Sequence, residues 1–177
     1  MSPNITATEC PTWVPQPTEL SNLELLLDGG FGPLAGFLGA RDVNSVQNHG
    51  ELADGRSWPV PITLRVSEEV AASELVELRD PEDAPIAIVE NTEPWSDETG
   101  SYLGGTVRAA TSDSFGVFRG IRPPAPTVRA SLADGPVLGL VPDKPLHRKE
   151  LAQINYAAQQ LGARVMLLPR MVGARSD

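Results

Sequence analysis

The chain has little of what disulfides, metal sites and membranes require. Cys10 is its single cysteine, and His49 and His147 are its two histidines. One cysteine excludes an intramolecular disulfide and a thiolate metal cluster within one chain, which favours a reducing compartment. A histidine-based metal site would need several carboxylates as further ligands, so no metal is expected. No segment approaches the roughly 18 apolar residues of a membrane helix, and the first residues lack the basic and apolar regions of a secretory signal. We therefore expect a cytoplasmic protein without a membrane partner.

Basic residues are also scarce. The sequence has 14 Lys and Arg against 23 Asp and Glu, a formal net charge of −9. Nonspecific affinity for nucleic acids comes from neutralising phosphates with basic side chains, so no nucleic-acid partner is expected and any anion site must be local. A hydrophobic content of 41% with 21% charged residues is typical of a globular protein, while 17 prolines and 16 glycines favour turns and β-structure over long helices.

The pattern of the first 130 residues predicts an extended arm, over residues 1–18, followed by a small β-barrel with short helices. Ser21 can cap the start of a helix, with Glu24 three residues later, and Gly29 can take the left-handed position after its last turn. Residues 31–39 are too rich in glycine and proline for a regular element but contain four large apolar side chains. We expect a buried, irregular loop there.

Alternation of apolar and other residues predicts the strands of this barrel. The first strand has an alternating set made of Val60, Ile62, Leu64 and Val66. Pro59 and Pro61 place its start at a sheet edge. Further strands are expected within residues 74–80, 84–91 and 101–109, and a short helix within residues 42–48. The adjacent Gly104 and Gly105 would permit a bulge or bend in the last strand.

The pattern changes after residues 121–130, a proline-rich stretch typical of a semi-rigid linker. A short apolar strand is expected over residues 136–141, an amphipathic helix over 147–162 and a second apolar strand over 164–169. Such a succession predicts one parallel β-α-β unit.

Several of these stretches resemble a known family. ELSNLELLLDGGFGPLAGFL, ELADGRSWPVPITLRVSEEVA, PIAIVEN and YLGG are similar to the N-terminal, PUA-like β-barrel domain of ATP sulfurylase (sulfate adenylyltransferase). The resemblance covers roughly Glu19 to Gly173, and the segment that the family carries between the last two stretches is shortened here to TEPWSDETGS. It implies an α+β fold, a PUA-like β-barrel with short helices followed by a single β-α-β unit resembling the start of a Rossmann-like nucleotidyltransferase domain. The expected domains are an arm (1–18), the barrel (19–130) and a truncated β-α-β remnant of the catalytic domain (131–177).

The stretch PVLGLVPDKPLHRKE resembles the opening of that catalytic domain but departs from it at charged positions. The family has a Gln-Thr-Arg-Asn loop followed by Pro-Leu-His-Arg-Ala-His, and here Pro145, Leu146, His147 and Arg148 match. Val141 replaces the glutamine, Asp143 the arginine that binds sulfate and phosphate, Lys144 the asparagine, and Glu150 the second histidine. Leu168 stands where the family often has a histidine. The family's later catalytic elements, including its Gly-Arg-Asp motif, are expected to be missing.

These departures bear on catalysis because every substrate of sulfate adenylylation is an anion. As the resemblance implies, the reaction joins sulfate to the α-phosphorus of ATP, and the protein supplies positioning and positive donors. Asp143 and Glu150 instead present carboxylates that repel phosphate. No catalytic residue and no required cofactor are therefore expected.

A helix N-terminus attracts anions, so His147, Lys144 and Arg148 are the candidate nucleotide-binding residues, with ATP or adenylyl sulfate as the ligand. The alternative is that His147 is an inherited helix-start residue that hydrogen-bonds locally. The stretch GGFGPLAGF lacks the Gly-Lys-Ser/Thr ending of a phosphate-binding loop and does not follow a strand, so packing explains it better.

Three functions remain open from the sequence. The leading hypothesis is an ATP-sulfurylase-like protein without independent catalysis, acting as a scaffold or interaction module. The alternative is a nucleotide-binding adenylyltransferase that uses sulfate or an altered acceptor, alone or with a partner subunit. RNA binding, suggested by the PUA-like fold alone, is opposed by the acidity. An uncovered parallel strand pair must be buried, so a homo-oligomer or a protein partner covering the β-α-β unit is expected.

Overall fold

The structure is a computed structural model, and it describes residues 10–110, 123–132 and 134–168. The chain divides into two compact units, residues 1–127 (the first unit) and 128–177 (the second unit). The first unit contains β1 (Thr12–Trp13), α1 (Pro17–Leu27), β2 (Gly36–Phe37), α2 (Ala40–His49), β3 (Leu64–Val66), α3 (Glu68–Ala71), β4 (Leu75–Arg79), β5 (Pro85–Asn91), β6 (Trp95–Asp97), β7 (Gly100–Leu103) and β8 (Gly105–Ala109). Helix α4 (Ala125–Ser131) spans the boundary, and β9 (Val137–Leu140), α5 (Arg148–Leu161) and β10 (Arg164–Leu167) follow.

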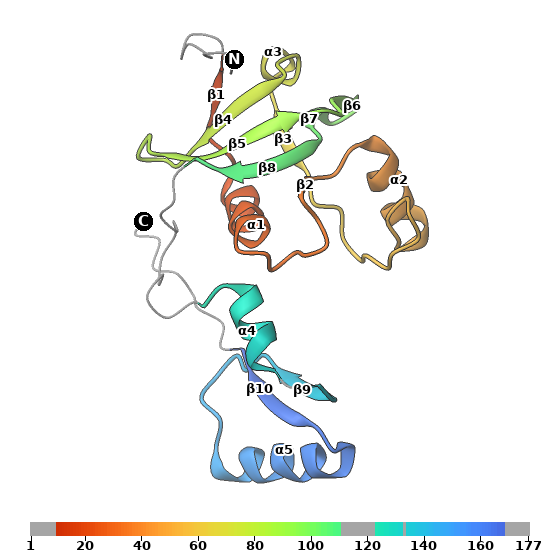
Figure 1. The fold of residues 1–177 in the computed structure, drawn as a ribbon, viewed down its shortest axis with the longest axis vertical. Helices are drawn as coiled ribbons and strands as arrows, with labels where there is room; N and C mark the ends of the chain where they lie inside the picture. The colour runs from red at the N-terminus through yellow and green to blue at the C-terminus, as the bar shows by residue number, and fades with distance from the viewer. Residues whose placement is uncertain (1–9, 111–122, 133, 169–177) are drawn as a thin grey trace. The chain divides into compact units, whose positions relative to one another are not determined.

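Two sheets surround the core of the first unit (Figure 1). The larger has the strand order β1-β4-β5-β8-β2, and the smaller has the order β3-β7-β6. Strands β7 and β8 are consecutive but belong to different sheets, and only Gly104 separates them. The bend expected at the glycine pair is confirmed, because Gly105 has φ +151 and thus a conformation that side chains rarely adopt.

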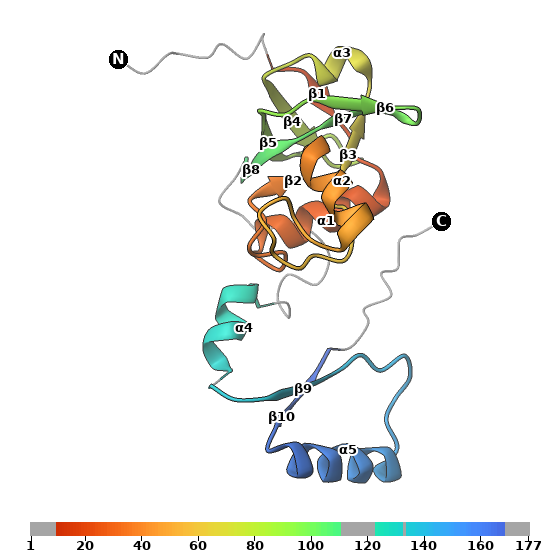
Figure 2. The ribbon, with the colours of Figure 1, turned by 90° about the vertical axis from the view of Figure 1, so that its right-hand side faces the viewer.

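One apolar cluster fills the space between these elements. Its members from the two sheets include Leu64, Val76, Leu78, Val89 and Leu103, all fully buried. Helix α1 adds Leu20 and Leu23, and lies against one face of the larger sheet (Figures 1 and 2). The α+β class with a PUA-like domain, predicted from the sequence, is confirmed.

Helix α1 begins at Pro17, four residues before the predicted cap at Ser21. Gln16 is the N-cap, and its backbone N–H donates to Glu19 Oε2 at 2.7 Å, while Pro17 at the first helical position loses no hydrogen bond. Ser21 lies inside the helix and donates its hydroxyl to the Pro17 carbonyl at 3.0 Å. Gly29 has φ +77, as expected after the last turn. The predicted arm therefore contains β1 and the first two residues of α1, and its residues 1–9 lie outside the described part of the chain.

The first predicted strand is shorter than its alternation suggested. Strand β3 contains only Leu64–Val66, and the side chain of Val60 is 57% exposed. Pro59 and Pro61 have no N–H to give to a neighbouring strand, so regular pairing cannot extend through them. The Leu38 N–H donates to the Ile62 carbonyl at 2.9 Å, which holds this segment to the end of β2.

Residues 31–39 are packed rather than open, as expected. Phe37 and Leu38 are buried, and Phe31 and Leu34 pack against the core. The interpretation was incomplete in one respect, because Gly36 and Phe37 form strand β2 and pair with β8.

The predicted linker is partly helical. Residues 125–131 form α4, whereas residues 121 and 122 lie outside the described part of the chain. Pro126 falls in the first turn of α4, where a missing N–H costs no internal hydrogen bond, so a proline-rich stretch can still enter a helix.

The second unit is the expected parallel β-α-β unit. Strands β9 and β10 pair in parallel from Val137↔Arg164 to Leu140↔Leu167. Burial alternates along both strands: Leu138, Leu140 and Met166 are half-buried, and Val137, Val165 and Leu167 are exposed. Figures 1 and 2 show α5 along one face of the strand pair. By this register Leu138, Leu140, Val165 and Leu167 share one face of the pair, and Val137, Gly139, Arg164 and Met166 share the other.

Among the described residues, no helix is both long and apolar enough to cross a membrane.

Candidate functional site

The candidate residues lie where β9 leads into α5. The strand ends at Leu140, and His147 is the N-cap of α5, with φ −82 and ψ 161. Lys144 is in the connecting loop, and Arg148 is the first residue of the helix. The structure therefore places all three candidates at one helix N-terminus, as the sequence predicted. All three side chains are exposed.

Glu150 occupies this helix start. Its Oε2 accepts a hydrogen bond from the His147 backbone N–H at 2.7 Å, and its Oε1 lies 3.8 Å from Lys144 Nζ. Glu150 is the third residue of the helix, the position from which an acidic side chain can reach back to the N-cap N–H. The carboxylate of the chain itself therefore takes up one backbone donor and the ammonium group that an external anion would use.

The same contacts change the titration of Glu150. The His147 N–H is the main cause that lowers the pKa of this carboxyl below its ordinary value, and the charges of Lys144 and His147 act in the same direction. Glu150 thus stays ionised at neutral pH and keeps a negative charge at the helix N-terminus. Asp143, exposed in the adjoining loop, adds a second carboxylate.

Sequence reasoning treated Glu150 only as a repelling charge in place of a histidine and missed its structural role. The available signal was its spacing, because an acidic residue three positions after an N-cap is typical of a capping box. No group of three or more His, Cys, Asp or Glu side chains that could hold a metal ion occurs among the described residues.

We expect the capping role of Glu150 to appear as a pH dependence. The pKa of Glu150 is lower in the folded chain than in the unfolded chain, so its contribution to helix stability is complete above the unfolded pKa and disappears as the pH falls through the folded pKa. Acidification should therefore lower the protection factors of the amides at the start of α5, measured relative to the intrinsic exchange rate at each pH. In Glu150→Gln, which cannot ionise, this change should be smaller, and equal changes in both proteins would contradict the assignment.

The second candidate region, GGFGPLAGF, has a packing role in the structure. An added Cβ on Gly36 would lie 2.8 Å from the carbonyl carbon of Gly105 and 2.8 Å from Thr106 Cα. Two backbones approach each other closely here, and no side chain larger than hydrogen fits between them.

Comparison with known proteins places the chain in a family. Residues 3–110 match the family described as PUA-like domain. The sulfate adenylyltransferase of Eremothecium gossypii is 29% identical over 191 aligned residues, which cover 90% of this chain and 38% of that protein. The sulfate adenylyltransferase of Acaryochloris marina is 42% identical over 80 residues, or 43% of this chain and 21% of that protein. That of Synechococcus elongatus is 36% identical over 122 residues, or 67% of this chain and 28% of that protein.

A solved structure gives the same result. The protein described as hexameric APS kinase from Thiobacillus denitrificans has a TM-score of 0.76 and 26% sequence identity, over 97% of this chain and 36% of that one. The chain spans less than two fifths of the length of each of these relatives. The match to the PUA-like domain covers more than half of the chain, and the alignment with the Eremothecium enzyme continues through most of the rest. The chain belongs to the ATP sulfurylase family and carries that family's N-terminal PUA-like domain.

Proposed function

We propose that this ATP-sulfurylase-like chain does not catalyse adenylyl transfer with its own residues and serves as an interaction module. The observation that carries the proposal is the position of the Glu150 carboxylate, which accepts the His147 N–H and pairs with Lys144 at the start of α5. An anionic substrate would have to displace this carboxylate before it could use the same donors.

The chemistry of the relatives explains why this matters. Transfer of an adenylyl group from ATP to sulfate brings several anionic groups together, and preorganised positive donors stabilise the charge in the transition state. Removing one such donor commonly costs about 2.7–4 kcal/mol of transition-state stabilisation. Here Asp143 and Glu150 present carboxylates at the corresponding loop and helix start. The barrier for adenylyl transfer at this helix would therefore be raised by both.

A second candidate function rests on the exposure of His147, Lys144 and Arg148 within one loop and one helical turn. In this alternative the three side chains hold ATP or adenylyl sulfate, and adenylyl passes to sulfate or an altered acceptor with release of pyrophosphate, alone or with a partner subunit. The geometry favours the first proposal, because Glu150 accepts the His147 N–H and places a negative charge beside Lys144.

The proposed setting is the cytoplasm, without a nucleic-acid partner, a metal or a required cofactor. The first unit contains seven basic and 19 acidic residues, which opposes binding to a phosphate backbone. A homo-oligomer, or a protein partner on the second unit, is the expected assembly. The relative from Thiobacillus denitrificans is described as hexameric, which supports self-association.

Calorimetric titration with ATP and with adenylyl sulfate tests this function. We expect no saturable heat with either ligand at millimolar concentration, and the same result for His147→Ala. The double variant Asp143→Arg with Glu150→His, which restores the family's charge pattern, should gain affinity for ATP if the two carboxylates are the barrier. Saturable binding to the unaltered chain that His147→Ala abolishes would favour the nucleotide-binding alternative.

A further inference from the structure

Strand β10 has one edge that pairs with no other strand among the described residues. Its sheet contains only β9 and β10 among the described residues. The Arg164 N–H donates to the Pro136 carbonyl at 3.0 Å, and the Leu168 N–H donates to the Leu140 carbonyl at 2.8 Å. Backbone groups of alternate residues point to opposite edges of a strand, so those of Val165 and Leu167 point away from β9. These two residues offer two donors and two acceptors to another strand.

This edge lacks the features that normally prevent pairing. Edge strands of soluble proteins are protected by charges, prolines or bulges. Arg164 is the only charged residue in β9 and β10, and neither strand contains proline. The side chains of Val165 and Leu167 are also exposed, at 38% and 48%. The edge is therefore suited to accept a strand.

We propose that a second copy of this chain occupies the edge, with the two β10 strands antiparallel about a twofold axis in a continuous sheet β9-β10-β10-β9. The proposal rests on the interaction role inferred above and names the partner and the surface. Antiparallel pairing follows from the symmetry, because a twofold axis perpendicular to the sheet reverses the strand direction.

The backbone directions fix the register. All four free groups are used when Val165 stands opposite Leu167 of the partner subunit, and Leu167 opposite Val165 of the partner subunit. Met166 then lies at the axis opposite Met166 of the partner subunit, in a non-hydrogen-bonded pair. Arg164 faces Leu168 of the partner subunit, so no like charges meet. The apolar cross-strand pairs of Val165 with Leu167 of the partner subunit add to the stability.

The charges of α5 complement each other in this arrangement. The twofold axis places both α5 helices on the same face of the sheet and antiparallel. Arg148 and Lys149 lie in the first turn, where the helix dipole disfavours cations, and the last turn contains no basic residue. Antiparallel helices bring these cations toward the carbonyl end of the partner helix. No charged residue occurs from Leu151 to Leu161, so no repulsion opposes the contact.

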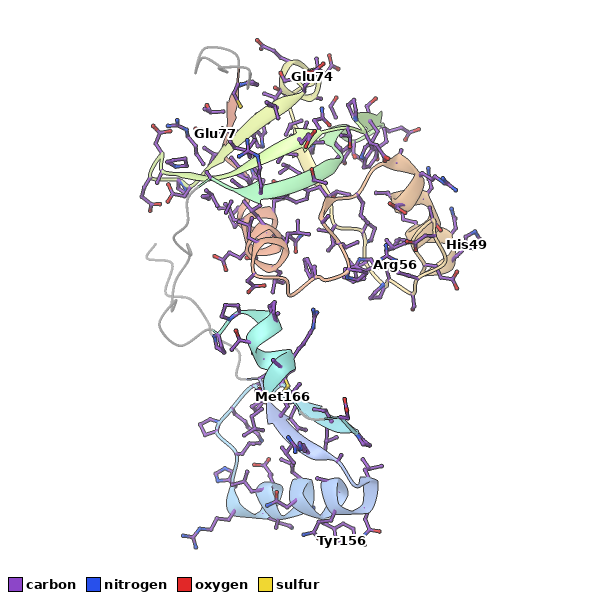
Figure 3. The ribbon with its side chains drawn as sticks, viewed as in Figure 1. His49, Arg56, Glu74, Glu77, Tyr156 and Met166 are labelled. Atoms are coloured by element: carbon purple, nitrogen blue, oxygen red, sulfur yellow. The ribbon has the colours of Figure 1, made fainter. Side chains whose placement is uncertain are left out.

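The distribution of apolar surface favours a second copy of this unit over the first unit as the occupant. Eight large apolar side chains are exposed in the described part of the second unit: Val137, Val141, Leu151, Tyr156, Leu161, Val165, Leu167 and Leu168. In the described part of the first unit, Val14 and Val60 are the exposed ones. Tyr156 lies on the side of α5 away from the strands, and Met166 lies in β10 (Figure 3). The exposed apolar surface of the second unit can therefore be covered by the same unit of another copy.

Cysteine cross-linking tests the register in the full chain carrying Cys10→Ser. In the proposed dimer the two Met166 Cα atoms lie about 4.5 Å apart, as in any non-hydrogen-bonded antiparallel pair, which is within the range that a disulfide can bridge. The two Val165 Cα atoms are two residues out of step and lie beyond the limit of about 7 Å. Under mild oxidation Met166→Cys should form at least ten times more linked dimer than the matched Val165→Cys. Equal or absent cross-linking would overturn the proposal.

Sedimentation equilibrium of two variants at one position tests the edge itself. Leu167→Pro removes the N–H that points to the free edge and leaves the bonds to β9 intact, whereas Leu167→Ala keeps that N–H. The proline variant should raise the dissociation constant of the dimer at least tenfold more than the alanine variant. If circular dichroism shows that the proline variant is misfolded, the cross-linking result decides. A wild-type chain that is monomeric and silent toward ATP overturns the dimer alone, and a dimer that binds ATP overturns the proposed function alone.

Discussion

Replacing Gly36 by alanine is expected to lower the free energy of unfolding of the first unit by about 3 kcal/mol. The new Cβ would stand well inside van der Waals contact with the Gly105 carbonyl oxygen. The obstacle is the backbone of β8, which also pairs with β5 along five residue pairs and cannot move aside like a flexible side chain. Strand β2 would have to leave the sheet, and Phe37 would lose its buried position with it.

Tryptophan fluorescence gives a clean measurement of this effect, because Trp13, Trp58 and Trp95 all lie in the first unit and pack against its core. Chemical unfolding followed by fluorescence should show a large fall in the midpoint for Gly36→Ala. The matched control is Gly139→Ala in β9, where an added Cβ meets nothing within 4 Å. It should leave the fluorescence transition unchanged. A change of less than about 0.5 kcal/mol for Gly36→Ala would show that β2 is not held against β8.

Leu64→Ala is expected to destabilise the first unit by a similar amount, about 3 kcal/mol. Leu64 in β3 pairs with Leu103 in β7, and both side chains are fully buried. Truncation removes buried methyl groups and leaves a cavity that β3, held in register by its pairing with β7, cannot close.

The control for Leu64→Ala lies in the same segment of the chain. Val60 belongs to the same alternating set in the sequence but is 57% exposed in the structure, so Val60→Ala should change the free energy of unfolding by less than about 0.5 kcal/mol. Thermal unfolding followed by fluorescence separates the two, since about 3 kcal/mol corresponds to a shift of roughly 10 °C in a unit of this size. Equal losses for both variants would mean that the strand extends back to Val60, as its alternation suggested.

The parts of the fold that were predictable are those set by local periodicity. Strand β4 alternates clearly and β5 is a short apolar run next to a turn-rich segment, so the existence of both followed from the sequence, and they pair along five residue pairs. Ala87 and Val89 are fully buried and Ile88 only half-buried, because the face of β5 that meets the core is chosen by its pairing with Val76 and Leu78 of β4. Which face is buried depends on the partner strand and cannot be predicted from the sequence of β5 alone.

Elements defined by distant partners could not be predicted in this way. Strand β1 contains two residues and exists because Thr12 and Trp13 pair in parallel with Glu77 and Leu78. The early start of α1 is likewise supported from afar, since Glu19 Oε1 accepts the Arg65 N–H at 2.8 Å. Ser21 was predicted as the cap because a local sequence pattern contains no information about the contact between Glu19 and the distant Arg65.

The candidate site was also predictable only in part. Its place at the strand-to-helix junction followed from the periodicity on either side of residues 141–147. The direction of the Glu150 side chain did not, because reaching back to the N-cap or outward to solvent depends on a rotamer and on the neighbouring Lys144. Spacing identifies the residues at such a site, and geometry decides whether they bind one another or a ligand.

The pairing of β2 with β8 has a consequence for synthesis on the ribosome. Gly36 pairs with Thr106, so β2 is synthesised early but cannot pair until β8, about 70 residues later in the chain, has also been synthesised. At about 5–20 residues per second, the wait lasts roughly 3–14 seconds, during which Phe37 and the apolar side of α1 have no sheet to cover them. Nascent chains stalled before residue 105 should therefore remain open to proteases and chaperones, and the first unit can close only after its last strand has emerged.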